Sequence, residues 1–107
     1  MGKDVLGGFE HQVLLAVVRL GEGGAYTVPV VKSLTEASGK TPAAAAVYTT
    51  LRRLESRGLL VSEVQPSALG GRPRRMFRAL PEALDERRRT RVTLERLWEG
   101  LPALEGR

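Results

Sequence analysis

Residues 47–61 read VYTTLRRLESRGLLV, and this stretch decides the fold. Its apolar side chains recur at Val47, Leu51 and Leu54, which is the i, i+4, i+7 spacing of a helix with one buried stripe. Gly58 ends the pattern, as the left-handed residue that commonly follows a helix, and a run of β-forming residues begins there. The stretch therefore predicts a short helix with one apolar face, joined directly to a strand.

The faces of this helix outside the apolar stripe carry hydroxyl and guanidinium groups. They belong to Thr49, Thr50, Arg52 and Arg53, and we expect all four to lie outside the core. Successive residues on a helix point about 100° apart, so only one of the two arginines is expected to face a partner, and we favour Arg52. This helix can therefore bury one face in the core and offer its polar side to a partner.

The elements around this helix follow from turn residues and periodicity. In chain order, the sequence predicts helices over residues 9–20, 28–37 and 41–57, strands over 59–64 and 74–80, and a long helix over 81–101. Thr41 is the expected N-cap of the third helix, with Pro42 at its first position. Pro81 is expected to open the last helix.

Three helices followed by a β-hairpin form the winged helix-turn-helix plan. We therefore expect an α+β, mostly helical fold with a hairpin wing and a long C-terminal dimerisation helix. Residues 1–80 would form the DNA-binding domain, and residues 81–107 the dimerisation helix and tail of the same structural unit. We expect no separate effector domain beyond them.

The net charge of +5 is concentrated in one part of the chain. Between Lys40 and Arg96 basic residues exceed acidic ones by seven, whereas the rest of the chain carries a net charge of −2. Arginine supplies 14 of the 17 basic residues, and its planar fork suits phosphates and guanine edges. This favours double-stranded DNA as the partner, with a solubilising surface as the alternative. The run ERRRTR at 86–91 is expected to form helical ion pairs rather than a second phosphate site.

Two segments supply the candidate DNA contacts. Ala43 and Ala44 are small enough to let the start of the third helix approach DNA closely. In the predicted wing, two glycines allow a turn and Arg72, Arg74 and Arg75 follow it, where they can enter a minor groove or bind phosphates. With the third helix, the candidate DNA-binding residues are Thr41, Ala43, Ala44, Tyr48, Thr49, Arg52, Arg53, Arg72, Arg74 and Arg75.

Composition argues against other classes of protein. The longest apolar run, Val13 to Val18, has six residues, far fewer than the roughly 20 of a membrane helix. The chain has no cysteine and a single histidine, His11, which we expect to be partly buried rather than functional. We find no catalytic constellation, so we expect no enzyme activity, metal or cofactor, and a cytoplasmic location.

Three segments in this order and spacing resemble the PadR-like family of transcriptional regulators. They are FEHQVLLAVVRLGEGGAY from residue 9, VYTTLRRLESRGLLVSE from residue 47 and GGRPRRMFRAL from residue 70. The resemblance implies a repressor that dimerises through its last helix and reads a palindromic operator, with Tyr48, Thr49, Arg52 and the wing arginines facing DNA. The chain departs from the family pattern in three places: Thr41 must cap the third helix in place of a residue near Ala43, Thr27 stands where glycine is frequent, and Leu80 replaces a capping threonine.

The last helix carries an apolar stripe longer than the small domain can cover. Leu94, Trp98 and Leu101 continue this stripe, and such a stripe is expected to meet its symmetry mate in a homodimer. With Phe9 they are the candidate dimer or ligand residues. Relatives with a tryptophan here can bind planar aromatic compounds at the dimer centre, so a small-molecule-responsive regulator is one alternative. A winged helix used for protein–protein association is the other.

Overall fold

The computed structural model describes residues 6–67 and 70–101, and of Glu86 it describes the backbone only. Its elements, in chain order, are α1 (Gly8–Leu20), α2 (Thr27–Ser38), α3 (Ala44–Ser56), β1 (Leu60–Gln65), β2 (Arg74–Ala79) and α4 (Pro81–Trp98). The predicted winged helix-turn-helix with a long C-terminal helix is confirmed. Ala68 and Leu69 of the expected wing loop, and the expected tail after Leu101, lie outside the described residues.

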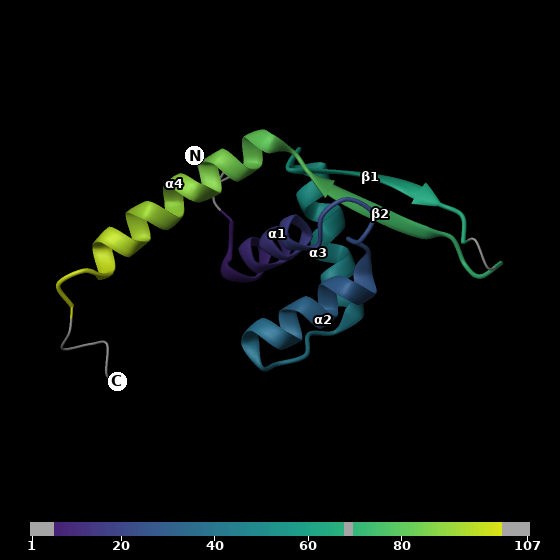
Figure 1. The fold of residues 1–107 in the computed structure, drawn as a ribbon, viewed down its shortest axis with the longest axis horizontal. Coiled ribbons are helices and arrows are strands. Elements are labelled where there is room, and N and C mark those ends of the chain that lie inside the picture. The colour runs from purple at the N-terminus through teal and green to yellow at the C-terminus, as the bar shows by residue number, and fades with distance from the viewer. Residues whose placement is uncertain (1–5, 68–69, 102–107) are drawn as a thin grey trace.

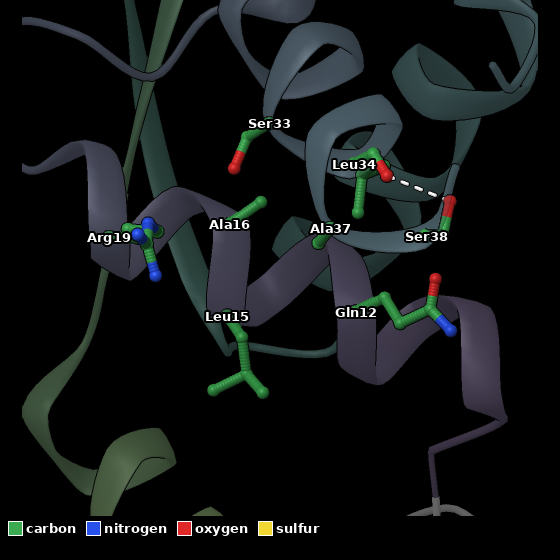
Figure 2. Close-up of a pocket in the computed structure, with 8 residues that line it drawn as sticks. All are labelled: Gln12, Leu15, Ala16, Arg19, Ser33, Leu34, Ala37 and Ser38. Carbon is green, nitrogen blue, oxygen red and sulfur yellow. Dashed lines mark hydrogen bonds between the residues drawn. The ribbon is translucent and has the colours of Figure 1, made fainter. Parts of the chain in front are cut away.

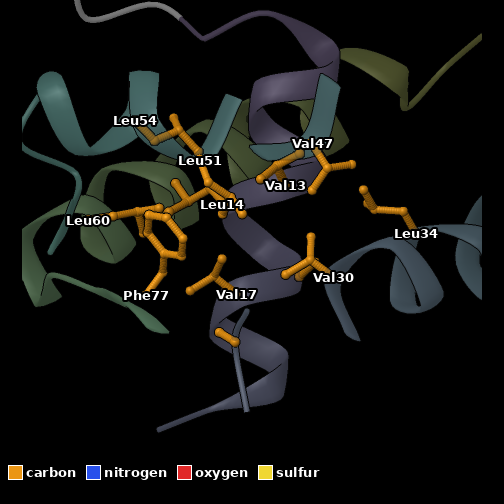
Figure 3. Packing of buried hydrophobic residues seen from close by; sticks show 12 residues of the cluster. Val13, Leu14, Val17, Val30, Leu34, Val47, Leu51, Leu54, Leu60 and Phe77 are labelled. Carbon is orange, nitrogen blue, oxygen red and sulfur yellow. The ribbon is translucent and has the colours of Figure 1, made fainter. Parts of the chain in front are cut away.

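The three N-terminal helices and the base of the hairpin share one apolar core. Figure 3 shows side chains from α1, α2 and α3 packed in one cluster, with Phe77 of β2 at one side and Leu34 of α2 at the other. Val47, Leu51 and Leu54 are all fully buried, so the stripe predicted from their spacing is confirmed. At roughly 1.5–3 kcal/mol for each fully buried large apolar side chain, this stripe holds α3 against α1 and α2.

A Schellman motif ends α3 and turns the chain into β1. Gly58 adopts φ +81°, its amide donates to the Glu55 carbonyl at 3.0 Å, and the Leu59 amide donates to the Leu54 carbonyl at 3.0 Å. The left-handed residue expected at Gly58 is confirmed. The helix therefore leads into the hairpin through a single fixed turn.

The hairpin is antiparallel, with its register running from Leu60 opposite Ala79 to Gln65 opposite Arg74. Two backbone hydrogen bonds fasten its base. The Phe77 amide donates to the Ala25 carbonyl at 2.8 Å, and the Leu80 amide donates to the Leu59 carbonyl at 3.1 Å. The second bond joins the start of α4 to the turn after α3. Figure 1 shows α4 and the hairpin extending from this region in opposite directions, and the longest dimension is 55 Å.

The prediction that Thr41 caps α3 is wrong. The helix begins at Ala44, and its N-cap residue Ala43 makes no side-chain cap bond. The chain is still extended at Ala43 (φ −67°, ψ 136°), which moves the start of the helix beyond the reach of Thr41. The Thr41 hydroxyl instead accepts a hydrogen bond from the Thr35 hydroxyl of α2 at 3.3 Å.

Two further expectations need correction. Thr50 is 4% exposed rather than outside the core, because it lies three residues after Val47 and four before Leu54, on the same stripe. The last helix ends at Trp98 rather than Leu101. Extended backbone at Glu99 and a left-handed Gly100 break it, so Leu101 lies beyond the helix.

Candidate nucleic-acid interface

One flank of α3 is open to solvent while the opposite stripe is buried. Tyr48, Thr49 and Arg52 lie on the open flank, and Ala43 and Ala44 are exposed where the helix begins. The alanines leave room for another molecule to approach the backbone closely. A polar surface that begins at the start of α3 thus faces away from the core.

Tyr48 and Arg52 form a pair on this flank. Arg52 Nη1 donates to the Tyr48 hydroxyl at 3.1 Å, with the guanidinium carbon 6.0 Å from the ring centre. The Tyr48 ring meets Phe77 edge-on, with centroids 6.4 Å apart, so the core supports the pair from below. The hydrogen bond from Arg52, more than its charge or the neighbouring Arg75, lowers the pKa of Tyr48. Because its oxygen accepts from a guanidinium, the phenol can turn its proton outward as a donor.

A carboxylate of α3 links this pair to the hairpin. Glu55 Oε1 lies 3.3 Å from Arg52 Nε, and Glu55 Oε2 accepts a 2.6 Å hydrogen bond from Ser62 of β1. The Ser62 oxygen in turn accepts from Arg75 Nη1 of β2 at 3.0 Å. Side chains of α3, β1 and β2 are therefore joined through Glu55, and two arginines are held on the same side of the molecule.

A groove lies between α3, the start of α2 and the loop end of the hairpin. Its volume is about 380 Å³, and its lining residues are Tyr26, Thr27, Tyr48, Val64, Pro73, Arg74 and Arg75. The Arg74 guanidinium stacks on the Tyr26 ring, 4.5 Å from its centre, just before the start of α2. The groove thus has two guanidinium groups and two phenols on its walls, a set suited to phosphate oxygens.

Two other predicted DNA contacts, Arg72 and Arg53, lie in different places. Arg72 is exposed in the described part of the hairpin loop. Arg53 lies elsewhere, because its Nη1 is 3.7 Å from Glu10 Oε2 of α1. Glu10 also accepts hydrogen bonds from Arg57 Nη1 at 3.2 Å and from the Gly7 amide at 3.1 Å. Of the two adjacent arginines, only Arg52 joins the groove side chains.

Sequence reasoning missed the residues that hold the site together. Glu55, Ser62 and Tyr26 were not among the candidates, although each contacts a candidate arginine. Glu55 carries the one local signal, because a glutamate three residues after an arginine on a helix predicts an ion pair. The Ser62 and Tyr26 contacts join different elements, and the periodicity of a single element gives no sign of them.

A second surface, between α1 and α4, has the opposite character. A groove of about 360 Å³ there is lined by His11, Leu15, Val18, Leu84, Arg87, Arg88, Arg91, Leu94, Glu95 and Trp98. Trp98 is 56% exposed and Leu94 47%, and Phe9 and Leu101 are also exposed. Leu15 and Val18 of α1 are exposed and face this groove, so α1 is not buried on all of its apolar sides. Large apolar side chains on two helices are thus left in water.

Polar groups in and around this groove pair locally. Arg91 Nε contacts Glu95 at 3.1 Å, and Arg88 contacts Asp85 at 3.5 Å, which confirms helical pairing in the run 86–91. Burial, and then the charge of Arg87, lower the pKa of His11. The imidazole is therefore neutral near pH 7, as a partly buried side chain should be.

A third groove runs between α1 and α2. Figure 2 shows Ala16 and Ala37 facing each other from the two helices, with Arg19 at one end and Gln12 near the other. The volume is about 410 Å³. Ser38 donates to the Leu34 carbonyl at 2.8 Å, so its hydroxyl is already used by its own helix. Small side chains on both helices account for the hollow.

Two classes of site have no basis in the described residues. Across 6–67 and 70–101, no three histidine, aspartate or glutamate side chains gather closely enough to hold a metal ion. Within those same ranges, no helix combines the length and the apolarity needed to cross a membrane.

Comparison with known proteins points to one family. Residues 14–82 match the family model described as the transcriptional regulator PadR-like family. The crystal structure of a PadR family transcriptional regulator from Eggerthella lenta DSM 2243 is 35% identical, with a TM-score of 0.67, covering 86% of this chain and 79% of that one. No curated protein matches the sequence.

More distant structures share the fold. A PadR-like transcription factor from Bacteroides fragilis is 22% identical, with a TM-score of 0.71, covering 90% of this chain and 88% of that one. A Streptococcus transcriptional regulator is also 22% identical, with a TM-score of 0.66 and 91% of each chain covered. These likenesses show that the arrangement of α1 to α4 and the hairpin recurs in other regulators.

Proposed function

This chain belongs to the PadR-like family of transcriptional regulators, not to a family of enzymes, and we propose that it acts as a homodimeric repressor on a palindromic operator. The observation that carries the proposal is the groove between α3 and the wing, which Tyr48, Arg74 and Arg75 line and where Tyr48 accepts a hydrogen bond from Arg52. Its setting would be the cytoplasm, where operator DNA is accessible.

Each part of this surface has its own role in the proposal. The start of α3, with Ala43 and Ala44, enters the major groove, and Thr49 and Arg52 read base edges there. Arg74 and Arg75 bind phosphates beside the groove, and Arg72 extends along the DNA from the hairpin loop. Phosphate contacts then supply most of the affinity, and α3 supplies the sequence preference.

The homodimer would form through the α1–α4 surface. Leu15, Val18, Leu94 and Trp98 are exposed around one groove, and apolar side chains clustered in this way mark an interaction surface. A two-fold axis through this surface would present two copies of α3 to successive half-sites, about 34–36 Å apart on B-DNA. Sedimentation analysis of the purified chain measures the stoichiometry directly.

Selection of bound duplexes from a random library tests the DNA function. We expect a palindromic consensus, and affinity for it that falls steeply with salt. The double substitution Arg72→Ala/Arg74→Ala should weaken binding to every sequence and flatten the salt slope by about 0.9 for each phosphate that is no longer neutralised. Arg89→Ala/Arg96→Ala is the matched control, because it also removes two exposed cations, from α4, which extends away from the hairpin (Figure 1). A salt slope unchanged by the double substitution would contradict the role of the wing.

The exposed tryptophan favours a second, compatible function as a small-molecule sensor. Trp98 lies on the α1–α4 groove, whose lining is mainly apolar, and a planar aromatic compound could stack on its ring. The test is the fluorescence of Trp98, the only tryptophan, during titration with planar aromatic compounds. Saturable quenching with release of operator DNA is expected, and an unresponsive spectrum would exclude the pocket for the compounds tried.

A further inference from the structure

The proposed function assigns no role to Glu55, the carboxylate that contacts Arg52 and Ser62. Resting on the proposed DNA binding, we propose that Glu55 is a specificity-determining residue. It holds Arg52 in an orientation for reading a base edge, and it lowers the affinity for DNA of any other sequence.

A hydrogen bond from strand β1 fixes the position of the Glu55 side chain. Its side chain is 26% exposed, and Oε2 accepts the 2.6 Å hydrogen bond from Ser62 of β1. Arg75 Nη1 donates to the same Ser62 oxygen at 3.0 Å, which polarises the hydroxyl toward the carboxylate. The carboxylate is therefore anchored to the hairpin rather than moving with a free side chain.

This anchored carboxylate orients Arg52. Glu55 Oε1 lies 3.3 Å from Arg52 Nε, and the Tyr48 hydroxyl accepts from Arg52 Nη1 at 3.1 Å. A guanidinium has five donors, so three remain after these two contacts, and the Arg52 side chain is 46% exposed. Bidentate recognition of a base needs a fork held in a fixed plane, and contacts at two of its nitrogens, Nε and Nη1, hold that plane.

The negative charge also opposes binding that is not specific. A carboxylate on a DNA-facing surface repels phosphates whatever the sequence, and it competes with them for the Arg52 guanidinium. A correct operator offsets this repulsion through base contacts, whereas other DNA does not. Glu55 therefore widens the difference between operator and random DNA at the expense of total affinity.

The test is Glu55→Gln, which removes the charge but leaves an oxygen able to accept from Ser62. Affinity for a random-sequence duplex, measured by fluorescence anisotropy, should rise about threefold, and its salt slope should steepen by up to about 0.9, because Arg52 becomes free to bind a phosphate. The ratio of operator to random affinity should fall. Asp85→Asn is the matched control, since it removes the same charge from another i, i+3 pair with arginine, on α4.

A double-mutant cycle assigns the effect to Arg52. In an Arg52→Gln background, Glu55→Gln should no longer steepen the salt slope, because no guanidinium is released. A second variant, Glu55→Asp, keeps the charge but is one methylene too short to reach Arg52 and Ser62 together. Because the negative charge beside Arg52 is kept, the salt slope should stay at its wild-type value. Because Arg52 is no longer held in one orientation, the ratio of operator to random affinity should still fall. This variant replaces Glu55→Gln in the test if far-UV circular dichroism shows that Glu55→Gln is unfolded.

The outcomes separate this inference from the proposed function. If the wild-type chain binds its operator and Glu55→Gln weakens operator and random DNA equally, or changes neither, Glu55 is structural and the inference is overturned. If Asp85→Asn raises random affinity as much as Glu55→Gln, overall charge explains the effect and the inference is again overturned. Failure of the wild-type chain to bind any selected duplex would overturn the proposed function itself.

Discussion

The hairpin end and the α4 end of this molecule expose opposite kinds of surface. At the hairpin end, Arg52, Arg74 and Arg75 each have a partner within the chain, so the polar groups are already oriented. At the α4 end, Leu94 and Trp98 remain in water. One chain by itself can organise a surface for a charged ligand, because hydrogen bonds fix direction. Removing an apolar helix face from water takes a second surface.

The largest expected effect concerns the core beneath the hairpin end. Phe77→Ala should lower the free energy of unfolding by about 3–5 kcal/mol, because a buried phenyl ring leaves a cavity between α1, α3 and the strands. The measurement is urea-induced unfolding. Val28→Ala is the control, since Val28 is 67% exposed on α2 and its truncation should change stability by less than about 0.5 kcal/mol. If both variants lowered the free energy of unfolding equally, Phe77 would not belong to the core.

The second prediction concerns the α4 end. Leu94→Ala/Trp98→Ala should weaken homodimerisation at least about thirtyfold, since a buried tryptophan and its neighbour typically contribute about 2 kcal/mol or more to an interface. Sedimentation equilibrium measures the dissociation constant. Val64→Ala removes an equally exposed apolar side chain from the hairpin end and should leave the constant unchanged. If Val64→Ala raised the dissociation constant and the α4 variant did not, the dimer interface would lie at the hairpin end.

The third prediction concerns the phenol at the hairpin end. Tyr48→Phe keeps the ring against Phe77 but removes the hydroxyl, and affinity for operator and random DNA should both fall about three- to tenfold, as expected for one hydrogen bond to a phosphate. The salt slope should not change, because no cation is removed. The comparison variant is Tyr26→Phe, which retains the ring stacked on Arg74. A loss confined to operator DNA would instead identify Tyr48 as a base contact.

The smallest effect should come from the lone histidine at the α4 end. Burial and Arg87 lower the pKa of His11 from its ordinary value of 6.5. As the pH falls below about 6.5, the unfolded chain takes up the proton before the folded chain does, so stability is lost down to the folded-state pKa. Urea unfolding between pH 7.5 and 5.5 should show this decline, and His11→Gln should flatten it. An identical pH profile for the variant would show that other groups cause the decline.

The features that the sequence predicted correctly depend on interactions between residues close together in the chain. The features that it missed depend on contacts between different elements. The buried stripe of α3 and the turn at Gly58 depend on residues a few positions apart, so periodicity and glycine chemistry were sufficient. The N-cap of α3 was predicted wrongly. The chain is still extended at Ala43, and the Thr41 hydroxyl forms a hydrogen bond with Thr35 of α2, a contact between two elements that the local sequence does not indicate. The apolar pattern of α1 did not distinguish Val13 and Leu14, which are buried in the core, from Leu15 and Val18, which are exposed.

The candidate site was predicted in part for the same reason. The arginines and Tyr48 are visible as residue types on an expected helix and hairpin. Their partners are not, because the contacts of Arg75 with Ser62 and of Arg53 with Glu10 join residues 13 and 43 positions apart in the sequence. Helix geometry predicted that Arg52 and Arg53 point in different directions, and the folded coordinates add that Glu10 of α1 is the partner of Arg53.

The hydrogen bond from the Leu80 amide to the Leu59 carbonyl has a mechanical consequence. It fastens the start of α4, 18 residues and about 27 Å long, to the turn that ends α3, so a change in the direction of α4 would be transmitted to α3. A tilt of about 10° at the start of α4 displaces the far tip by about 5 Å. If two copies pair along α4, as we propose, a small shift between the two α4 helices would change the distance between the two copies of α3.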